Sequence, residues 1–240
     1  MKDTTNKEAT VSGRRHNNQS WSPSPAYLSH EPFRSLVPMQ VYPAGIELCK
    51  QGCEAHDVYY IEKGLIKISC IGAGGRQLII GLRYPRCIFG AESLILREPS
   101  LITASTLTDC QLYRIPGDIF LTYLQSSPHL SWNLFEIQSR EIYEQNSRLA
   151  QLGCCSAQER LEVFLLQLIA AFGLDASGEE IHIQLPLKYC ELAELIAVTP
   201  EYLSVLIKRM EREGLVRHDK HYLIITDSQR IKGGSDGWMG

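Results

Sequence analysis

The stretch that most restricts the fold of this chain is residues 187–216, which holds two short helical patterns separated by a tight turn. The first pattern covers residues 188–196, where apolar residues repeat at helical spacing. The turn follows at residues 197–198. Two short helices joined in this way are typical of the helix-turn-helix motif, whose second helix lies in the major groove of DNA.

The second helix has a defined beginning and end. Thr199 stands where an N-cap residue belongs, and Pro200 occupies the first helical position, where its missing N–H has no cost. Gly214 is placed to end the helix as a C-terminal cap. Between these ends, four residues form one apolar stripe: Leu203, Leu206, Ile207 and Met210.

Strand-like sequences surround the two helices and predict a winged helix. Residues 215–217 and 222–225 flank the polar run 218–221 as a β-hairpin wing, and residues 181–185 alternate in polarity as a third strand. The alternative is an ordinary helical hairpin inside another core. The wing favours DNA binding over that alternative.

Composition narrows the class of protein. The 240 residues suffice for two modest domains, and 44% hydrophobic with 21% charged residues is ordinary for a soluble globular protein. Neither a membrane-spanning run nor a secretory signal is recognisable, so we expect a cytoplasmic protein without a membrane partner. No glycine-rich nucleotide loop, nucleophile motif or metal-ligand spacing stands out, so we do not expect an enzyme or a metal site.

The sequence pattern of the N-terminal half is typical of a β domain. Residues 1–26 predict a disordered tail, and residues 27–126 carry short apolar runs between turn residues, as in an antiparallel sandwich or barrel. Within this domain, residues 58–61 and 65–68 predict a hairpin, and a further strand at residues 78–82 follows a glycine-rich turn.

Residues 127–153 predict a long helix, capped by Ser127 and stopped at Gly153. It is about 37 Å long at 1.5 Å per residue, which is long for a small domain. We expect it to pair with its copy in a homodimer, although Glu141 and Asn146 interrupt a clean heptad. The alternative is a single helix packed on the β domain. Its expected apolar side consists of Leu130, Leu134, Ile137, Ile142, Leu149 and Leu152.

The remaining chain divides into a DNA-binding domain at residues 154–232 and a flexible tail at residues 233–240. Eight cysteines are scattered without a C-x-x-C pair, which favours free thiols, several of them in the core. The adjacent Cys154 and Cys155 are candidates for sensing oxidants or soft metals. The favoured alternative is that they only pack at a helix junction.

The order of these parts resembles the cyclic-AMP receptor protein/FNR family of bacterial transcription regulators. The resemblance covers about residues 30–230 and rests on motifs at residues 42–45, 57–64, 89–92, 159–161 and 212–216. It implies an α+β fold: an N-terminal antiparallel β-roll like the cyclic-nucleotide-binding jelly roll, a long dimerisation helix and a C-terminal winged helix-turn-helix. It also implies double-stranded DNA as partner, and RNA polymerase if the protein is an activator.

The resemblance marks a set of candidate effector residues. In relatives that bind cyclic nucleotides, a Phe-Gly-x-Glu segment cradles the phosphate, an arginine pairs with its charge, and the long helix meets the purine. That arginine is replaced here by Ile102, which removes about 1.5–3 kcal/mol, or roughly ten- to a hundredfold in affinity. Arg97 is nearby as a substitute. The corresponding positions are Gly90, Glu92, Ile102, Thr103, Gln145 and Asn146.

No cofactor is predicted, and cyclic nucleotide or haem remain alternatives. No cysteine precedes Cys49, which argues against the iron–sulfur cluster of FNR-type members. His56 and His129 are haem-ligand candidates by residue type alone.

The candidate DNA-contacting residues depart from the common family pattern, because Val205 stands where an arginine is usual. We therefore expect a half-site that differs from the usual guanine-anchored one. The second functional hypothesis is an effector-sensing or interaction module whose winged helix no longer binds DNA. The candidates are Thr199, Glu201, Tyr202, Ser204, Val205, Lys208 and Arg209.

Overall fold

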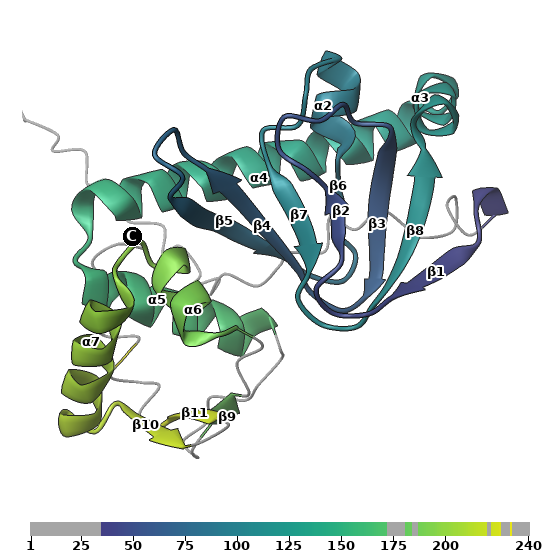
Figure 1. Ribbon diagram of the computed structural model, residues 1–240. Helices are drawn as coiled ribbons and strands as arrows, with labels where there is room; N and C mark the ends of the chain where they lie inside the picture. Colours follow the sequence, from purple (N-terminus) through teal and green to yellow (C-terminus); the bar gives the residue numbers. More distant parts are fainter. Residues whose placement is uncertain (1–34, 172–180, 184–186, 220–221, 227–230, 232–240) are drawn as a thin grey trace, which may run out of the picture.

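The computed structural model describes residues 35–171, 181–183, 187–219, 222–226 and 231 (Figure 1). The tails expected at residues 1–26 and 233–240 lie outside these residues. The elements in chain order are β1 (Met39–Tyr42), β2 (Glu47–Cys49), β3 (Asp57–Lys63), β4 (Ile66–Ile71), β5 (Gln77–Arg83), β6 (Ile88–Phe89), α2 (Ala91–Leu96), β7 (Thr103–Thr106), β8 (Cys110–Pro116), α3 (Gly117–Ser126), α4 (Pro128–Cys154), α5 (Ala157–Ala171), β9 (Ile181–Ile183), α6 (Tyr189–Leu195), α7 (Pro200–Arg212), β10 (Val216–Asp219) and β11 (Tyr222–Ile225).

The N-terminal strands form the expected antiparallel β-roll. One sheet has the order β1-β8-β3-β6 and the other β2-β7-β4-β5. Alternate residues of both sheets point inward, because successive side chains of a strand face opposite sides. The resulting core includes Tyr59, Ile61, Ile66, Ile68 and Leu112.

The predicted hairpin between residues 58–61 and 65–68 is wrong. β3 pairs with β8 and β6, whereas β4 pairs with β5 and β7 in the other sheet. The turn between them carries Gly64 at φ 98°, where a Cβ would lie 2.5 Å from Cys110 Sγ. Glycine thus lets the chain cross closely from one sheet to the other. The strand at residues 78–82 does form a hairpin with β4.

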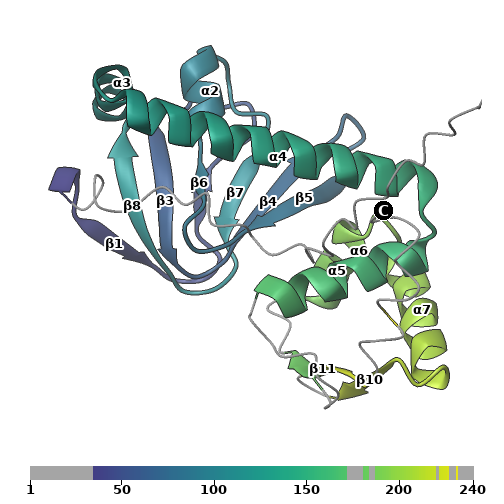
Figure 2. The same cartoon turned by 180° about the vertical axis from the view of Figure 1, so that it is seen from behind.

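The long helix α4 crosses the β-roll and reaches the C-terminal part of the molecule (Figure 2). The Ser127 side chain accepts a hydrogen bond from Leu130 N at 3.3 Å, which confirms the predicted N-cap. The predicted stop at Gly153 is wrong, since the helix runs on to Cys154. A glycine in the last turn weakens a helix without ending it.

The apolar residues of α4 do not form the single side that we expected. Leu130, Leu134 and Ile137 are buried against the β-roll, whereas Ile142 and Leu149 are exposed. The reason is that Ile142 and Leu149 follow Ile137 by five and twelve residues, which turns them roughly 120–140° away from the buried set at 3.6 residues per turn. The helix therefore has one apolar face that packs on the β-roll and a second apolar face that is exposed to solvent.

The C-terminal part is the expected winged helix. α6 and α7 form the helix-turn-helix, and the wing strands pair in the order β10-β11-β9. The Ser156–Glu159 capping box opens α5, with Ser156 N donating to Glu159 Oε2 at 2.6 Å. The core of this part is continuous with Ile79 and Leu82 of β5, so the winged helix packs directly on the β-roll.

Among the described helices, none combines the length and apolar character that a membrane-spanning segment requires.

Candidate DNA-binding surface and effector pocket

The inner face of α7 fixes this helix to the winged-helix core. All four residues of the predicted apolar stripe are buried: Leu203, Leu206, Ile207 and Met210. Gly214 has a φ of 67°, so the helix ends in the left-handed conformation that the sequence predicted. This packing leaves the opposite face of α7 to solvent.

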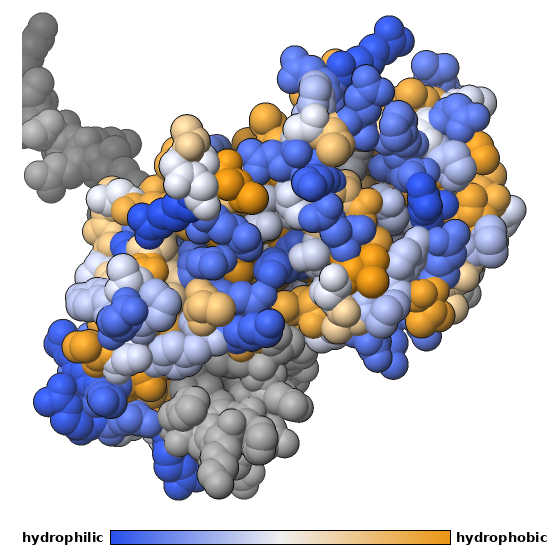
Figure 3. Space-filling model, in the orientation of Figure 1, coloured by the Kyte–Doolittle hydropathy of each residue, from blue (hydrophilic) through white to orange (hydrophobic). Residues whose placement is uncertain are grey.

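The outer face of α7 carries Glu201, Val205, Lys208 and Arg212, spaced at i, i+4, i+7 and i+11. All four side chains are exposed, and three of them line an open groove of ≈ 520 Å³ together with Glu211. This end of the molecule, at the lower left in Figure 3, is largely hydrophilic. Arg212 is absent from the sequence-based candidates, although its seven-residue spacing from Val205 signals the shared face.

Several predicted DNA contacts have partners within their own helix. Thr199 Oγ1 accepts from Tyr202 N at 3.3 Å and caps α7, and Ser204 Oγ donates to Pro200 O at 3.2 Å. Arg209 Nε donates to Glu213 Oε1 at 2.9 Å, one helical turn away. Of the predicted set, Tyr202, Val205 and Lys208 have side chains exposed to solvent.

The carboxylate of Glu201 is held in its ionised form. A hydrogen bond from its own backbone N–H, and a second one from the Thr199 hydroxyl, lower its pKa from the ordinary value. An ionised carboxylate at the start of the helix can accept a hydrogen bond from a cytosine amino group.

The carboxyl end of α6 is held by two arginines from other helices. Arg148 of α4 donates to Leu195 O and, at 3.1 Å, to Ile79 O of β5. Arg160 of α5 donates to Ile196 O at 2.9 Å. Guanidinium groups at the carboxyl end of a helix satisfy its unpaired carbonyls and favour its dipole.

A second link joins α6 to the β-roll. Lys67 Nζ of β4 lies 2.5 Å from Glu191 Oε1 of α6, and both side chains are mostly buried. Neither this pair nor the contacts of Arg148 could be predicted from local sequence patterns, because each joins residues far apart in the chain.

The turn at Gly90 leads into α2, and Glu92 in the first turn of that helix contacts α4. Gly90 has a φ of 90°, and a Cβ there would lie 2.9 Å from Asp57 O, so the close approach requires glycine. Glu92 accepts from Gln138 Nε2 at 3.4 Å and also hydrogen-bonds to Glu141. Both partners lie on α4, Glu141 about one turn and Gln138 about two turns before Gln145.

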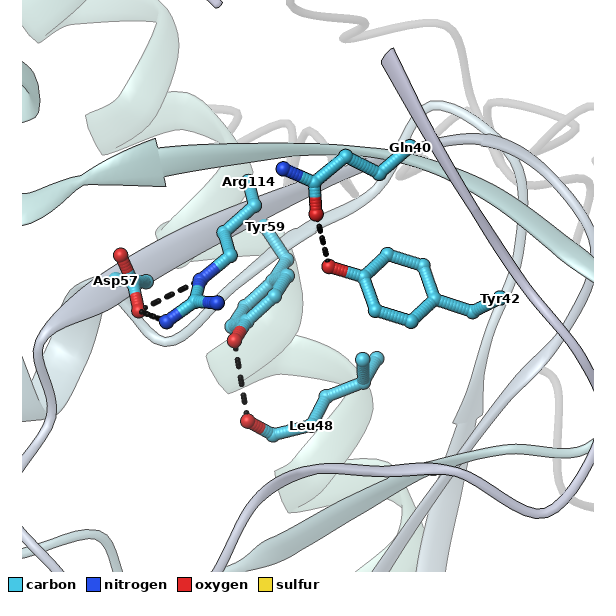
Figure 4. Close-up of polar contacts among 6 residues, drawn as sticks. All are labelled: Gln40, Tyr42, Leu48, Asp57, Tyr59 and Arg114. Carbon is cyan, nitrogen blue, oxygen red and sulfur yellow. Dashed lines mark hydrogen bonds and ion pairs between the residues drawn. The ribbon is translucent and has the colours of Figure 1, made fainter. Parts of the chain in front are cut away.

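Ile102, where the resemblance leads us to expect a phosphate-pairing arginine, lies in an apolar environment. Ile102 is half-buried and packs against the β-roll core that contains Tyr59 and Phe89. The two rings are stacked with centroids 5.0 Å apart, and Tyr59 Oη donates to Leu48 O at 3.1 Å (Figure 4). Neighbouring Thr103 accepts from Gln51 N at 3.1 Å.

Beside Tyr59, Arg114 binds Asp57 through Nε and Nη2 at 2.9 and 2.7 Å (Figure 4). Burial raises the pKa of Tyr59 to about 12, so its hydroxyl stays a donor at neutral pH. This network ties β3 to β8 and β2.

Gln145 and Asn146 are both exposed on α4. Gln145 lines a cavity of ≈ 130 Å³ between α4, β5, α5 and α6, whose other walls include Arg83, Glu141 and Arg148. This cavity joins the effector side of the molecule to the helix-turn-helix.

The redox and haem candidates gain no geometric support. Cys154 is exposed and Cys155 is buried at the end of α4, where burial, Glu159 and Cys154 raise the pKa of the Cys155 thiol. His56 and His129 are exposed and contribute to neither of the two cavities above. Across the described ranges, no three His, Cys, Asp or Glu residues are grouped to hold a metal ion.

Two family models match the two parts of this geometry. Residues 39–127 match the cyclic nucleotide-binding domain, and residues 159–232 match the Crp-like helix-turn-helix domain. The chain belongs to the Crp/Fnr family of transcription regulators. As a Crp/Fnr regulator, it joins an effector domain to a helix-turn-helix DNA-binding domain.

Individual Crp/Fnr proteins are distant in sequence. A CRP-like cAMP-activated global transcriptional regulator of Mycobacterium tuberculosis is 24% identical over 198 residues, or 82% of this chain and 88% of that protein. The structure of FixK2 from Bradyrhizobium japonicum gives a TM-score of 0.70 at 19% identity, covering 82% of this chain and 96% of that one. The structure of the c-di-GMP responsive regulator CLP of Xanthomonas campestris gives a TM-score of 0.72 at 18% sequence identity. The match covers 81% of this chain and 96% of that one. Their different effectors mean that family membership does not fix the effector here.

Proposed function

We propose that this Crp/Fnr regulator binds a two-fold symmetric DNA site as a parallel homodimer joined along α4. The observation that carries the proposal is an exposed apolar seam on that helix. Its members Trp132, Phe135, Ile142 and Leu149 are 65%, 63%, 57% and 69% exposed. Contiguous exposed apolar surface of this kind marks a protein interface.

The spacing of the α4 seam fits a helix pair. Phe135, Ile142 and Leu149 are seven residues apart and Trp132 precedes the first by three, as in the a and d positions of a heptad. Asn146 falls on an a position, where asparagine favours one register and two strands. Glu141 lies on the opposite, β-roll side, so it does not interrupt the seam. The same helix α4 can therefore pack on its own β-roll and pair with the α4 of a second chain.

A parallel pair would present two copies of α7 to one duplex. The support is that the α7 face with Val205, Lys208 and Arg212 stays exposed while the inner face is buried. Dimers of this type bind half-sites about one helical turn apart. Contact with RNA polymerase belongs to the same proposal if the protein activates transcription. The unusual half-site expected from Val205 stays a prediction.

Alanine at Lys208 or Arg212 is expected to weaken binding to duplex DNA about equally for all sequences. If each contacts a phosphate, each substitution lowers the slope of log affinity against log salt concentration by about 1. Fluorescence anisotropy at several salt concentrations measures both quantities. Arg209→Ala is the matched control, because its guanidinium is paired with Glu213. An unchanged slope in both variants would remove these residues from the interface.

The same titration tests the second hypothesis, an interaction module that no longer binds DNA. This second hypothesis is based on the acidic net charge of −3 and on the acidic residues interleaved on α7. It predicts no binding at any salt concentration. The open groove with Lys208 and Arg212 on its walls favours the regulator.

Cyclic AMP is expected to leave the melting temperature of the wild-type protein unchanged. Replacing Ile102 by arginine restores a phosphate-pairing charge and should raise the affinity roughly ten- to a hundredfold. Calorimetric titration of both proteins measures this, with Ile102→Met as the apolar control. Wild-type binding as tight as that of the arginine variant would show that the phosphate is paired elsewhere.

A further inference from the structure

Glu141 of α4 is a buried acid at the centre of the contact between the long helix and the β-roll. Its Oε1 lies 3.1 Å from Arg83 Nε of β5, and the two side chains are only 12% and 19% exposed. On its other side, Glu92 of α2 forms a hydrogen bond with it. One carboxyl group thus faces a cation on one element and a second carboxyl group on another.

The contact with Glu141 does not fully satisfy the Arg83 guanidinium. Arg83 Nε is buried, and within the described part of the chain it makes no hydrogen bond of acceptable geometry, despite the short distance to Glu141. The pair is therefore held by charge more than by a directed hydrogen bond. A hydrogen bond between two carboxyl groups, by contrast, requires one proton between them.

The charges around Glu141 favour uptake of that proton. Burial raises the pKa of Glu141 to about 7, Arg83 opposes the shift, and Glu92 and Glu144 add to it. Tyr84, directly after β5, and Arg148 of α4 also line the adjoining cavity. The charged and neutral forms of Glu141 are therefore both populated near neutral pH.

We propose that Glu141 is a proton-binding site that ties α4 to the β-roll, so that the proton acts as an effector of this regulator. In the neutral form, the Glu141 carboxyl group keeps its proton and donates a hydrogen bond to the Glu92 carboxylate. On release of that proton to water, the carboxylate is left to Arg83 and is repelled by Glu92 and Glu144. The neutral form consequently holds α4 and α2 together more firmly, whereas the ionised form binds Arg83 of β5 more strongly.

The cavity beside Glu141 connects this site to the DNA-binding domain. Its walls include Glu141 at one end and Arg148, Phe164 and Leu195 at the other. Arg148 lies two turns further along α4 and binds carbonyls of both β5 and α6. A change in how α4 is held against β5 and α2 therefore changes the support of α6, and the coupling to DNA rests on the proposed function.

The sign of the pH dependence follows from the direction of the shift. The folded-state pKa of Glu141 lies above the ordinary value of 4.5, so the folded protein keeps a proton that the unfolded chain releases. The contribution of Glu141 to stability is then greatest below the ordinary pKa of 4.5, and it falls as the pH rises through the folded-state pKa of about 7. DNA affinity falls in the same direction, because the firmly held arrangement already exposes the outer face of α7.

The experiment compares wild type with Glu141→Gln, which mimics the neutral acid, and with Glu136→Gln, which removes an exposed carboxylate from the same helix. Thermal unfolding and anisotropy with duplex DNA are measured from about pH 6 to about pH 8. We expect wild type and Glu136→Gln to lose stability and about fivefold or more in DNA affinity over this range. Glu141→Gln should lose neither.

A second variant separates a proton site from a merely structural contact. Glu92→Gln removes a charge that raises the pKa of Glu141, so the midpoint of the pH profile should move to lower pH while the protein stays folded. A wild-type unfolding profile that matches that of Glu141→Gln overturns the proton site. A pH-dependent stability with constant DNA affinity overturns the coupling. Absence of DNA binding at every pH refutes the proposed function instead, and the unfolding profiles still decide on the proton site.

Discussion

Replacing Ile142 by glutamate is expected to convert the protein from a dimer into a monomer of 27.1 kDa. The substitution puts two carboxylates face to face at the centre of the α4 seam, where they would be desolvated together. Within one chain the change is mild, because Ile142 is 57% exposed, and the free energy of unfolding of the monomer should change by about 0.5 kcal/mol or less.

The loss of the dimer should weaken binding to a two-fold DNA site by about a hundredfold or more, because the second half-site is no longer bound intramolecularly. Sedimentation and anisotropy measure the two effects. Arg140→Glu places a carboxylate on an exposed position of the same helix, outside the seam, and should leave both unchanged. A glutamate variant that remains a dimer would disprove the seam as the interface.

Replacing Arg148 by methionine is expected to lower the free energy of unfolding by about 2–4 kcal/mol, since two carbonyls lose a charged donor at a buried position. Burial and the nearby Arg160 lower the pKa of Arg148, which reflects how little water surrounds it. Methionine keeps most of the volume, so the loss measures the hydrogen bonds to Ile79 O and Leu195 O.

Denaturant unfolding measures this loss, and DNA affinity should fall with it because α6 supports α7. The control is Arg140→Met, which removes an exposed guanidinium two turns earlier. If Arg148→Met were as stable as this control, Arg148 would not connect the β-roll to the helix-turn-helix.

Local rules predicted most of the helix-turn-helix. The cap at Thr199, the buried stripe from Leu203 to Met210 and the left-handed Gly214 depend on neighbours within one or two turns, and all three are confirmed. The same holds for the cap of α4 at Ser127.

Predictions that depend on distant parts of the chain were less successful. Residues 58–68 have the pattern of a hairpin, but the approach of Gly64 to Cys110 sends the two strands into different sheets. The two apolar faces of α4 overlap in sequence, so periodicity alone merged them. The contacts of Arg83, Arg148 and Lys67 join residues 58, 47 and 124 or more positions apart and leave no local signal.

The core of the winged helix includes Ile79 and Leu82 of the β-roll, and α6 is held by an arginine from α4. The two regions matched by the family models therefore do not correspond to two separately unfolding domains. A fragment that begins at α5 would lack a side chain that closes α6 and two apolar residues that complete its interior. We conclude that heat or denaturant will melt effector and DNA-binding parts in one transition, as a single thermodynamic unit.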